Sequence, residues 1–259
     1  LPWLVQDYVL NKPVFALPPG LEPAPYYPSD ARRAGSGTAR PYDRGAMWTA
    51  GENLIRAGKV AAFVVAGGQG SRLGYDGPKG CFTAGAVTGK SLFQTFAENL
   101  LGVKDRYGVD VPWYIMTSPL NHKATTSFFE SHKFFGLRRD RVKFFPQGVL
   151  PSLDIKTGKV LLTSKHEVAT NPDGHGGSLK ALVVSGAIKE MKNLGVSHIS
   201  YFQVDNPNVR VLDPVFLGLH AANKESSSEM SSKMVTKANA EEKVGVFCLA
   251  GNKIEVIEY

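Results

Sequence analysis

A glycine-rich segment that directly follows an apolar run holds the residues whose types and spacing point most clearly to chemistry. It reads Ala66-Gly67-Gly68-Gln69-Gly70-Ser71-Arg72-Leu73-Gly74 and continues to Pro78-Lys79. Glycines let the backbone turn tightly and bring its N–H groups against anionic oxygens. Arg72 adds a guanidinium that binds two oxygens at once, and Lys79 adds a compact positive charge. The segment therefore predicts a phosphate-binding loop.

The spacing within this loop disfavours two other kinds of phosphate-binding loop. A Walker A loop needs G-x-x-x-x-G-K-[ST], which Lys79-Gly80 does not supply. A dinucleotide fingerprint needs G-x-G-x-x-G, whereas Gly68, Gly70 and Gly74 are spaced as G-x-G-x-x-x-G. No acidic residue follows at the ribose-binding distance of about 20 residues. The pattern is therefore not that of an NAD(P)-dependent oxidoreductase.

The elements that must position the loop alternate between strands and helices from Lys59 onward. Apolar, β-branched runs predict strands over residues 60–65, 111–116, 142–145 and 199–204. Amphipathic spacing predicts helices over 91–107, 125–135 and 178–194. This alternation specifies an α/β fold with a Rossmann-like, mostly parallel sheet covered by helices on both faces. Ligands bind such sheets beyond the carboxyl ends of the strands, which is where the glycine-rich loop lies.

The later part of the chain carries further expectations. The helix over 178–194 is expected to be continuous and to turn one set of apolar side chains inward: Leu179, Leu182, Val183, Met191 and Leu194. Hairpins are predicted over 153–162 and 244–257, and 223–242 is predicted to be a loop or a mobile insertion. The chain ends at Tyr259 directly after a strand, so we expect the fold to be incomplete at its C-terminus.

The first 58 residues are predicted to be a proline-rich arm followed by a short helix over 47–57, and 59–259 the main domain. Half of the chain's 16 prolines lie in the first 41 residues. An extended arm over a neighbouring surface is favoured by five aromatic side chains that could anchor it: Trp3, Tyr8, Phe15, Tyr26 and Tyr27. A disordered tail is the alternative.

Composition limits the partners and the compartment. A formal charge of +7 suits nucleic acid, a membrane surface or a phosphorylated small substrate. The cations are scattered, apart from a short run over 138–143, so we expect no nucleic-acid partner. The longest apolar stretch, 60–66, is far below the roughly 20 residues that span a bilayer. We therefore expect a protein without membrane contact, and a cytoplasmic one in which Cys81 and Cys248 are buried thiols.

The loop and five later segments resemble the eukaryotic-type UDP-sugar pyrophosphorylases, most closely those of the UDP-N-acetylglucosamine branch. The signature Gly-Gly-x-Gly-Thr/Ser-Arg-Leu-Gly followed by Pro-Lys-Gly stands at 67–74 and 78–80. Further matches follow in chain order: Pro112–Ser118, His132–Leu137, Phe144–Pro151, Pro172–Gly177 and Val204–Asn206. The resemblance runs from about Glu52 to Tyr259. It implies the fold of nucleotide-diphospho-sugar transferases, with 59–259 as part of a nucleotidyltransferase catalytic domain.

The resemblance also implies roles for individual residues. Those that would bind the nucleotide are Ala66, Gly67, Gly68, Gly70, Gln147 and Gly174. Gln147 would read the uracil edge through its amide, which is both donor and acceptor. Arg72 and Lys79 would be catalytic, stabilising charge on the α-phosphate and the leaving pyrophosphate. Asp205 would hold Mg²⁺, and His175 would touch the sugar.

The implied activity is that of a uridylyltransferase, which joins UTP to a sugar 1-phosphate and releases pyrophosphate by in-line attack. N-acetylglucosamine 1-phosphate is the first expectation for the sugar. Glucose or galactose 1-phosphate is the next, because His175 stands where the acetylglucosamine enzymes usually carry asparagine. Members of the family continue well beyond the hairpin at 244–257. A truncated, non-catalytic module that binds UTP or a UDP-sugar is therefore a second interpretation. The sequence leaves the oligomeric state open.

Overall fold

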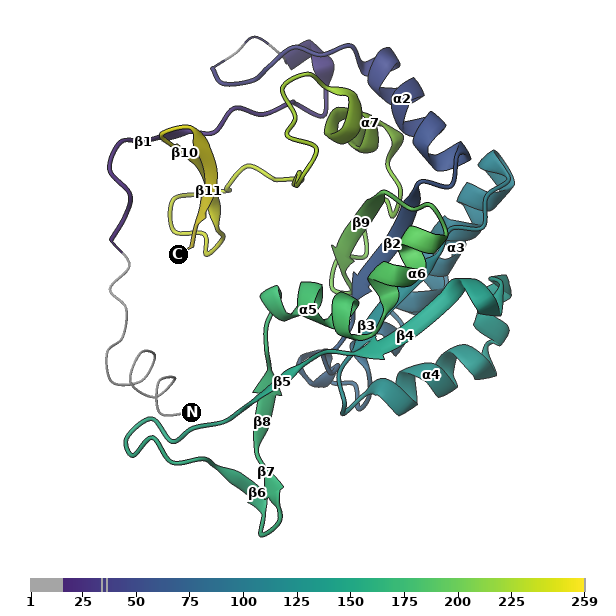
Figure 1. Cartoon of the computed structure of the whole chain (residues 1–259), viewed down its shortest axis with the longest axis vertical. Coiled ribbons are helices and arrows are strands. Elements are labelled where there is room, and N and C mark those ends of the chain that lie inside the picture. The colour runs from purple at the N-terminus through teal and green to yellow at the C-terminus, as the bar shows by residue number, and fades with distance from the viewer. Residues whose placement is uncertain (1–15, 34, 36, 259) are drawn as a thin grey trace.

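Four parallel strands form the sheet that carries the glycine-rich loop. The computed structural model describes residues 16–33, 35 and 37–258. In it, β2 (Val60–Val65), β3 (Trp113–Thr117), β4 (Val142–Pro146) and β9 (His198–Gln203) pair in the order β4-β3-β2-β9 (Figure 1). Every pairing in this sheet is parallel. The four strands predicted from the sequence are thus confirmed.

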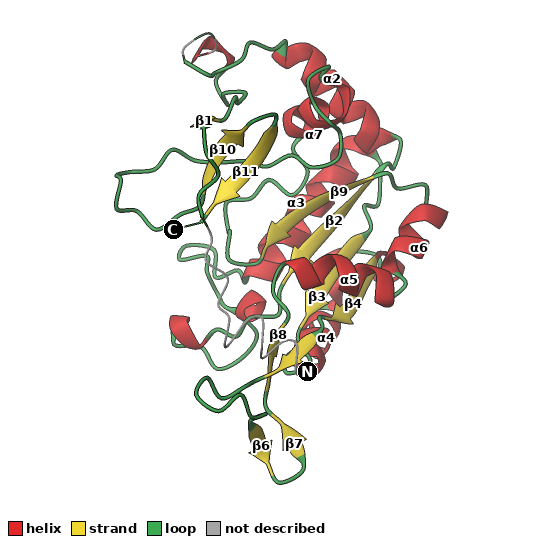
Figure 2. Ribbon diagram, turned by 60° about the vertical axis from the view of Figure 1, so that its left-hand side comes forward, coloured by secondary structure: helices red, strands yellow, loops and turns green. Residues whose placement is uncertain are grey.

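Helices cover both faces of the sheet because its central strand is apolar at every position. Ala62 and Val64 of β2 pack into the core on the side of α3 (Leu92–Tyr107) and α4 (His122–Ser131). Ala61 and Phe63 pack into a second core with residues of α5 (Gly176–Val184) and α6 (Ala187–Asn193). Successive side chains of a strand point to opposite faces, so two helical layers bury the whole strand (Figure 2). The predicted α/β class is confirmed.

A close helix crossing ties the beginning of the described chain to its later part. α2 (Arg44–Arg56) packs against α7 (Pro214–Ala222), a helix that the sequence reading missed. Both contact points are glycines. A Cβ on Gly51 would lie 1.8 Å from the carbonyl oxygen of Pro214, and one on Gly218 would lie 1.9 Å from that of Met47. The two backbones therefore touch. The division of the chain after residue 58 stays a prediction.

The helix expected over 178–194 is broken, which corrects the prediction. Gly186 adopts a left-handed conformation with φ of 79°, and it separates α5 from α6. The inward face changes with the break. Leu182 and Met191 are buried as expected, but Leu179 and Val183 are 68% and 66% exposed. Leu194 is also exposed, at 40%. The helix predicted over 125–135 ends at Ser131.

The arm contributes a strand rather than only a covering segment. β1 (Leu21–Pro23) pairs antiparallel with β10 (Val246–Ala250), which forms the expected hairpin with β11 (Lys253–Ile257). Tyr27 is one of the anchors: its hydroxyl donates to Asn223 Oδ1 at 2.9 Å. Tyr26 is exposed. The expected anchors Trp3, Tyr8 and Phe15 lie outside the described residues.

The remaining segments are short. A bridge between Leu153 and Val160 confirms the expected hairpin, and two further pairs flank it: β5 (Val149–Pro151) with β8 (Thr170–Pro172), and β6 (Leu162–Ser164) with β7 (Glu167–Val168). Cys81 is buried, and burial raises the pKa of its thiol to about 12. Cys248 is only half-buried, which corrects that expectation. Among the described residues, no helix has both the length and the apolarity to cross a bilayer.

Candidate active site

The glycine-rich loop and Asp205 lie at the point where the strand order reverses. From β2 the chain proceeds to β3 and β4 on one side, whereas β9 adds to the other side. In a parallel sheet this switch point leaves a crevice beyond the carboxyl ends of the two strands. The loop leaves β2 there, and Asp205 follows β9. The amide of Val204 donates to the carbonyl oxygen of Val65 at 3.1 Å, which holds the two exits together.

The loop folds back on itself and so brings its lysine to its first glycines. The amide of Gly70 donates to the carbonyl of Gly77 at 2.9 Å, and the amide of Lys79 donates to that of Gly68 at 3.1 Å. The ring of Tyr75 lies against both turns. A Cβ on Gly70 would come within 2.8 Å of it, and one on Gly77 within 2.9 Å. Only glycine fits at these two positions with the ring in place.

Lys79 and Asp205 meet across the crevice. The Nζ of Lys79 donates to Oδ2 of Asp205 at 2.8 Å, and the two side chains are 19% and 55% exposed. The ammonium group is therefore sheltered, while the carboxylate remains open to solvent. One cation and one carboxylate, placed on neighbouring strand exits, can bind a phosphate oxygen and a metal ion side by side.

Asn121 fixes the start of the loop and was not identified from the sequence. It is buried, and its Nδ2 donates to the carbonyl oxygens of Ala66 at 3.0 Å and Gly68 at 3.3 Å. Its Oδ1 accepts from the amide of Ser118 at 2.8 Å. With both carbonyls engaged, the loop has a fixed direction as it leaves β2. The signal for this role was the polar pair Ser118 and Asn121 just beyond the next strand.

Gln147 lies against Gly67. Its backbone N–H donates to the carbonyl oxygen of Thr117 at 2.8 Å, and its side chain is buried. A Cβ on Gly67 would lie 2.8 Å from Oε1 of Gln147. Gly67 therefore leaves room for the amide group of Gln147, and the structure brings these two predicted nucleotide-binding residues together.

The segment before α5 docks on the same strand exit. The amide of Asp173 donates to the carbonyl of Gly148 at 3.2 Å. The carboxylate of Asp173 fills the space beside two glycines: a Cβ on Gly148 would lie 2.2 Å from it, and one on Gly177 would lie 2.0 Å from it. Its Oδ1 is buried and has no hydrogen-bond partner among the described residues. Gly174 follows with a φ of 75°, which side chains rarely adopt.

His175 and Arg72 complete the predicted set. His175 precedes the first residue of α5, and its Nδ1 lies 2.7 Å from the hydroxyl of Tyr201 on β9. Arg72 lies on the exposed turn Ser71–Leu73, on the same loop as Lys79. It forms no hydrogen bond or ion pair within the described part of the chain. The structure thus pairs Lys79 with Asp205 and Gly67 with Gln147, whereas the side chain of Arg72 makes no hydrogen bond with either pair.

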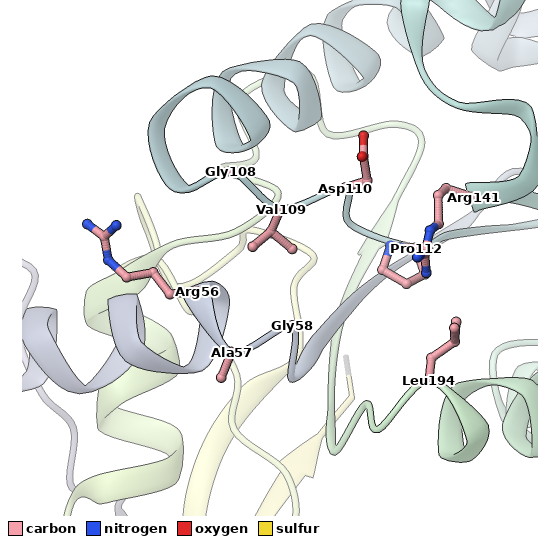
Figure 3. Close-up of a pocket in the computed structure, with 9 residues that line it drawn as sticks. All are labelled: Arg56, Ala57, Gly58, Gly108, Val109, Asp110, Pro112, Arg141 and Leu194. Carbon is pink, nitrogen blue, oxygen red and sulfur yellow. The ribbon is translucent and has the colours of Figure 1, made fainter.

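A partly open cavity lies at the opposite end of the sheet from the glycine-rich loop. It has a volume of about 390 Å³ and lies between the C-terminal ends of α2, α3 and α6. These helices are followed by Ala57, Gly108 and Leu194, which line the cavity. Carbonyl groups at helix C-termini carry partial negative charge, which disfavours phosphate. Arg56 and Arg141 both line the cavity (Figure 3), and the guanidinium group of Arg56 also lies over the ring of Tyr107. This cavity does not fit a nucleotide triphosphate.

Comparison with known proteins gives a consistent match. The model of the UTP–glucose-1-phosphate uridylyltransferase family matches residues 40–259. The chain is 41% identical over 230 residues to UDP-N-acetylglucosamine diphosphorylase 2 of Arabidopsis thaliana, covering 84% of this chain and 45% of that protein. It is 37% identical over 215 residues to the UDP-N-acetylglucosamine pyrophosphorylase of Saccharomyces cerevisiae, covering 82% and 44%.

Among solved structures, the chain resembles the uridine diphosphate N-acetylglucosamine pyrophosphorylase of Trypanosoma brucei in complex with an inhibitor. The TM-score is 0.74 at 31% identity, over 83% of this chain and 44% of that one. The chain spans about half the length of the curated relatives it matches.

Proposed function

The chain belongs to the UTP–glucose-1-phosphate uridylyltransferase family, and on that premise we propose that the whole protein joins UTP to a sugar 1-phosphate and releases pyrophosphate. The observation that carries this proposal is the meeting of Lys79 and Asp205 at 2.8 Å, beyond the carboxyl ends of β2 and β9. A sheltered cation beside an open carboxylate suits a triphosphate that arrives with a divalent cation.

The substrate we favour is N-acetylglucosamine 1-phosphate. The relatives from A. thaliana and S. cerevisiae are both named for UDP-N-acetylglucosamine. Glucose or galactose 1-phosphate is the alternative, because His175, which we assign to the sugar, stands where the acetylglucosamine enzymes usually carry asparagine. We also place the protein in the cytoplasm, where reducing conditions keep Cys81 and Cys248 as the free thiols found here.

The nucleotide would lie along the loop with its base toward Gln147. Uracil offers an acceptor at O4 and a donor at N3, and a side-chain amide matches both. The absence of a side chain at Gly67 and Gly68 lets the base and ribose approach the backbone. Ala66 and Gly70 would contact the nucleotide at the two ends of this stretch. Gly174 has no side chain, so it would let the segment before α5 approach the base.

Replacing Gln147 by glutamate should weaken binding of UTP by about 10- to 100-fold, since the acceptor of uracil loses its donor in a buried site. The carboxylate can still accept from the amino group of cytosine, so the preference for UTP over CTP should narrow. Calorimetric titration of the whole protein with each nucleotide measures both effects. Unchanged affinity for UTP, or an unchanged preference between the bases, would place the uracil elsewhere.

The reaction needs no covalent intermediate with the protein. A phosphate oxygen of the sugar 1-phosphate attacks the α-phosphorus of UTP, and the bond to the oxygen that bridges the α- and β-phosphates breaks. That oxygen leaves with pyrophosphate. Because the attacking phosphate is already anionic, no general base is required, and positioning and charge neutralisation supply most of the rate enhancement. Lys79 and Arg72 would neutralise charge on the α-phosphate and on the leaving group.

The side chains near the loop could hold Mg²⁺ only if phosphate oxygens of a bound nucleotide supply further ligands. No group of three or more His, Cys, Asp or Glu side chains in the described part of the chain is arranged to hold a metal ion. Asp205 offers one exposed carboxylate, and magnesium commonly takes one or two carboxylates with substrate phosphates and waters. When bound, the ion would supply charge neutralisation on the phosphates, and Asp205 would hold it.

A pyrophosphate-release assay on the whole protein tests the proposal. UTP and Mg²⁺ are supplied with N-acetylglucosamine, glucose or galactose 1-phosphate in parallel. Turnover that depends on both UTP and one sugar 1-phosphate is expected. Binding of UTP by calorimetry without turnover on any sugar would favour a binding module, and the absence of both binding and turnover would reject a uridine nucleotide site.

A further inference from the structure

Tyr201, which was not among the predicted site residues, forms a hydrogen bond with His175, which was. The hydroxyl of Tyr201 and the Nδ1 of His175 are 2.7 Å apart, a short hydrogen-bond distance. The two rings meet edge to face, with an angle of 81° between their planes. The contact joins β9 to the residue that precedes α5.

The ring of Tyr201 is itself held by the sheet. Tyr201 is the direct register partner of Phe63 on β2, and their rings meet edge to face with centroids 5.5 Å apart. Phe63 is buried in the core. The position of the Tyr201 hydroxyl is therefore set by the parallel pairing of β2 with β9, and it does not depend on a loop.

The hydrogen bond restricts what His175 can offer to a ligand. A phenol O–H is a good donor, and a neutral imidazole nitrogen is a good acceptor. Burial raises the pKa of Tyr201 above its ordinary value of 10, so the hydroxyl keeps its proton near neutral pH. When Nδ1 of a neutral imidazole accepts from Tyr201, the ring proton is on Nε2. That leaves Nε2–H as the group available for a ligand.

His175 also lies on the nucleotide side of the sheet. The segment before it docks on Gly148 through Asp173, and Gly148 follows Gln147 directly. Tyr201 lies within β9, and Asp205 follows four residues later, just beyond the end of that strand. The pair is thus connected through the chain to Gln147 on one side and to Asp205 on the other.

We infer that Tyr201 is a positioning residue, whose hydroxyl orients His175 so that its Nε2–H donates to an uncharged oxygen of the sugar. This inference rests on the proposed function, since it assigns a donor to the sugar 1-phosphate. An uncharged donor suits a hydroxyl or carbonyl oxygen of the sugar, whereas a phosphate would be served better by a cation. Tyr201 acts through His175 and does not touch the substrate.

Kinetics of Tyr201→Phe in the whole protein test the inference. Phenylalanine keeps the ring contact with Phe63 and removes only the hydroxyl. The KM for the sugar 1-phosphate should rise about 3- to 10-fold, the effect of one hydrogen bond, while the KM for UTP changes less than about twofold. Tyr107→Phe is the matched control, because it removes a hydroxyl that bonds Glu52 at 3.0 Å at the far edge of the sheet. It should leave both KM values unchanged.

A double-mutant cycle with His175→Ala separates positioning from a general structural effect. If Tyr201 acts only through His175, Tyr201→Phe should have no further effect on that KM once His175 is alanine. Nitrogen-15 spectroscopy of the neutral ring should find the Nε2–H tautomer in the unmodified protein and a mixture of tautomers in Tyr201→Phe.

Three results would overturn the inference: an unchanged KM for the sugar in Tyr201→Phe, additive effects in the cycle, or an Nδ1–H tautomer in the unmodified protein. Its failure is distinguishable from failure of the proposed function. An unmodified protein without turnover on any sugar 1-phosphate rejects the function itself, whereas normal turnover with any of the three results rejects only the role of Tyr201.

Discussion

Lys79→Ala is expected to lower kcat/KM for UTP by about 100- to 1000-fold, the range found when one group that stabilises transition-state charge is removed. The ammonium group lies 2.8 Å from Asp205, and a Cβ on Gly68 of the loop would lie 3.8 Å from it. Charge that develops on the α-phosphate and on the departing pyrophosphate would lose its nearest counter-charge. The pyrophosphate-release assay on the whole protein measures the change.

The same substitution should hardly affect folding. The Asp205 carboxylate is 55% exposed, and exposed ion pairs contribute about 0–1 kcal/mol to stability. Lys104→Ala is the matched control, since Lys104 pairs with Asp110 at 2.9 Å at the far edge of the sheet. It removes an equivalent ion pair and should keep full activity. Activity of Lys79→Ala within threefold of the unmodified protein would contradict the role assigned to this lysine.

Gly218→Ala is expected to reduce the free energy of unfolding by about 1–3 kcal/mol or more, as forced overpacking does. The added Cβ would lie 1.9 Å from the carbonyl oxygen of Met47, so α2 and α7 must move apart. Gly51→Ala should act alike, because its Cβ would meet the carbonyl of Pro214 at 1.8 Å. Here the obstacle is backbone, which cannot turn aside as a side chain can. Urea denaturation of the whole protein, with the slope of the transition compared as well as its midpoint, measures the change.

Gly102→Ala provides a control of opposite sign. Gly102 lies within α3, and a Cβ there would meet nothing within 4 Å. Alanine at an open helical position stabilises by about 0.5–1 kcal/mol relative to glycine. If all three substitutions shifted stability in the same direction, the close crossing of α2 and α7 would not be the cause.

Much of the fold follows from short-range patterns that the sequence displays openly. The strand at 60–65 is apolar throughout and bounded by glycines, and the helix from 92 begins at Ser91, whose hydroxyl accepts from the amide of Gln94. Such signals are local, so they predict an element whatever surrounds it. The glycine-rich loop was predicted for the same reason, because it lies immediately after a recognisable strand, whereas the role expected of Asp205 came from the family resemblance.

Other elements could not be predicted because their apolar residues have no clear face. In α5 apolar residues occur around the whole helix, so periodicity alone did not reveal its inward face or the break at Gly186 that separates it from α6. α7 is also mostly apolar, so its sequence shows no distinct buried face. It did carry a start signal, Asp213 followed by Pro214, with Oδ1 of Asp213 accepting from the amide of Val215.

The supporting residues of the site depend on contacts across the fold. Asn121 reaches the carbonyls of Ala66 and Gly68 only because β3 lies next to β2. Tyr201 reaches His175 only because β9 pairs with β2 in a register that places it beside Phe63. Neither the strand order nor the register is written in the spacing of a single segment. These two residues therefore emerge from the three-dimensional arrangement.

The crossing of α2 and α7 also has a consequence for biosynthesis. At ribosomal rates of roughly 5–20 residues per second, α2 leaves the ribosome on the order of ten seconds before α7 is made. During that interval it has no partner for its glycine face. The two helices differ accordingly: α2 buries only Gly51 and Ile55 and carries several charges, whereas the late helix is mainly apolar. The nascent chain thus exposes the more polar helix α2 first. The apolar helix α7 emerges later, when the surface of α2 that it packs against is already available.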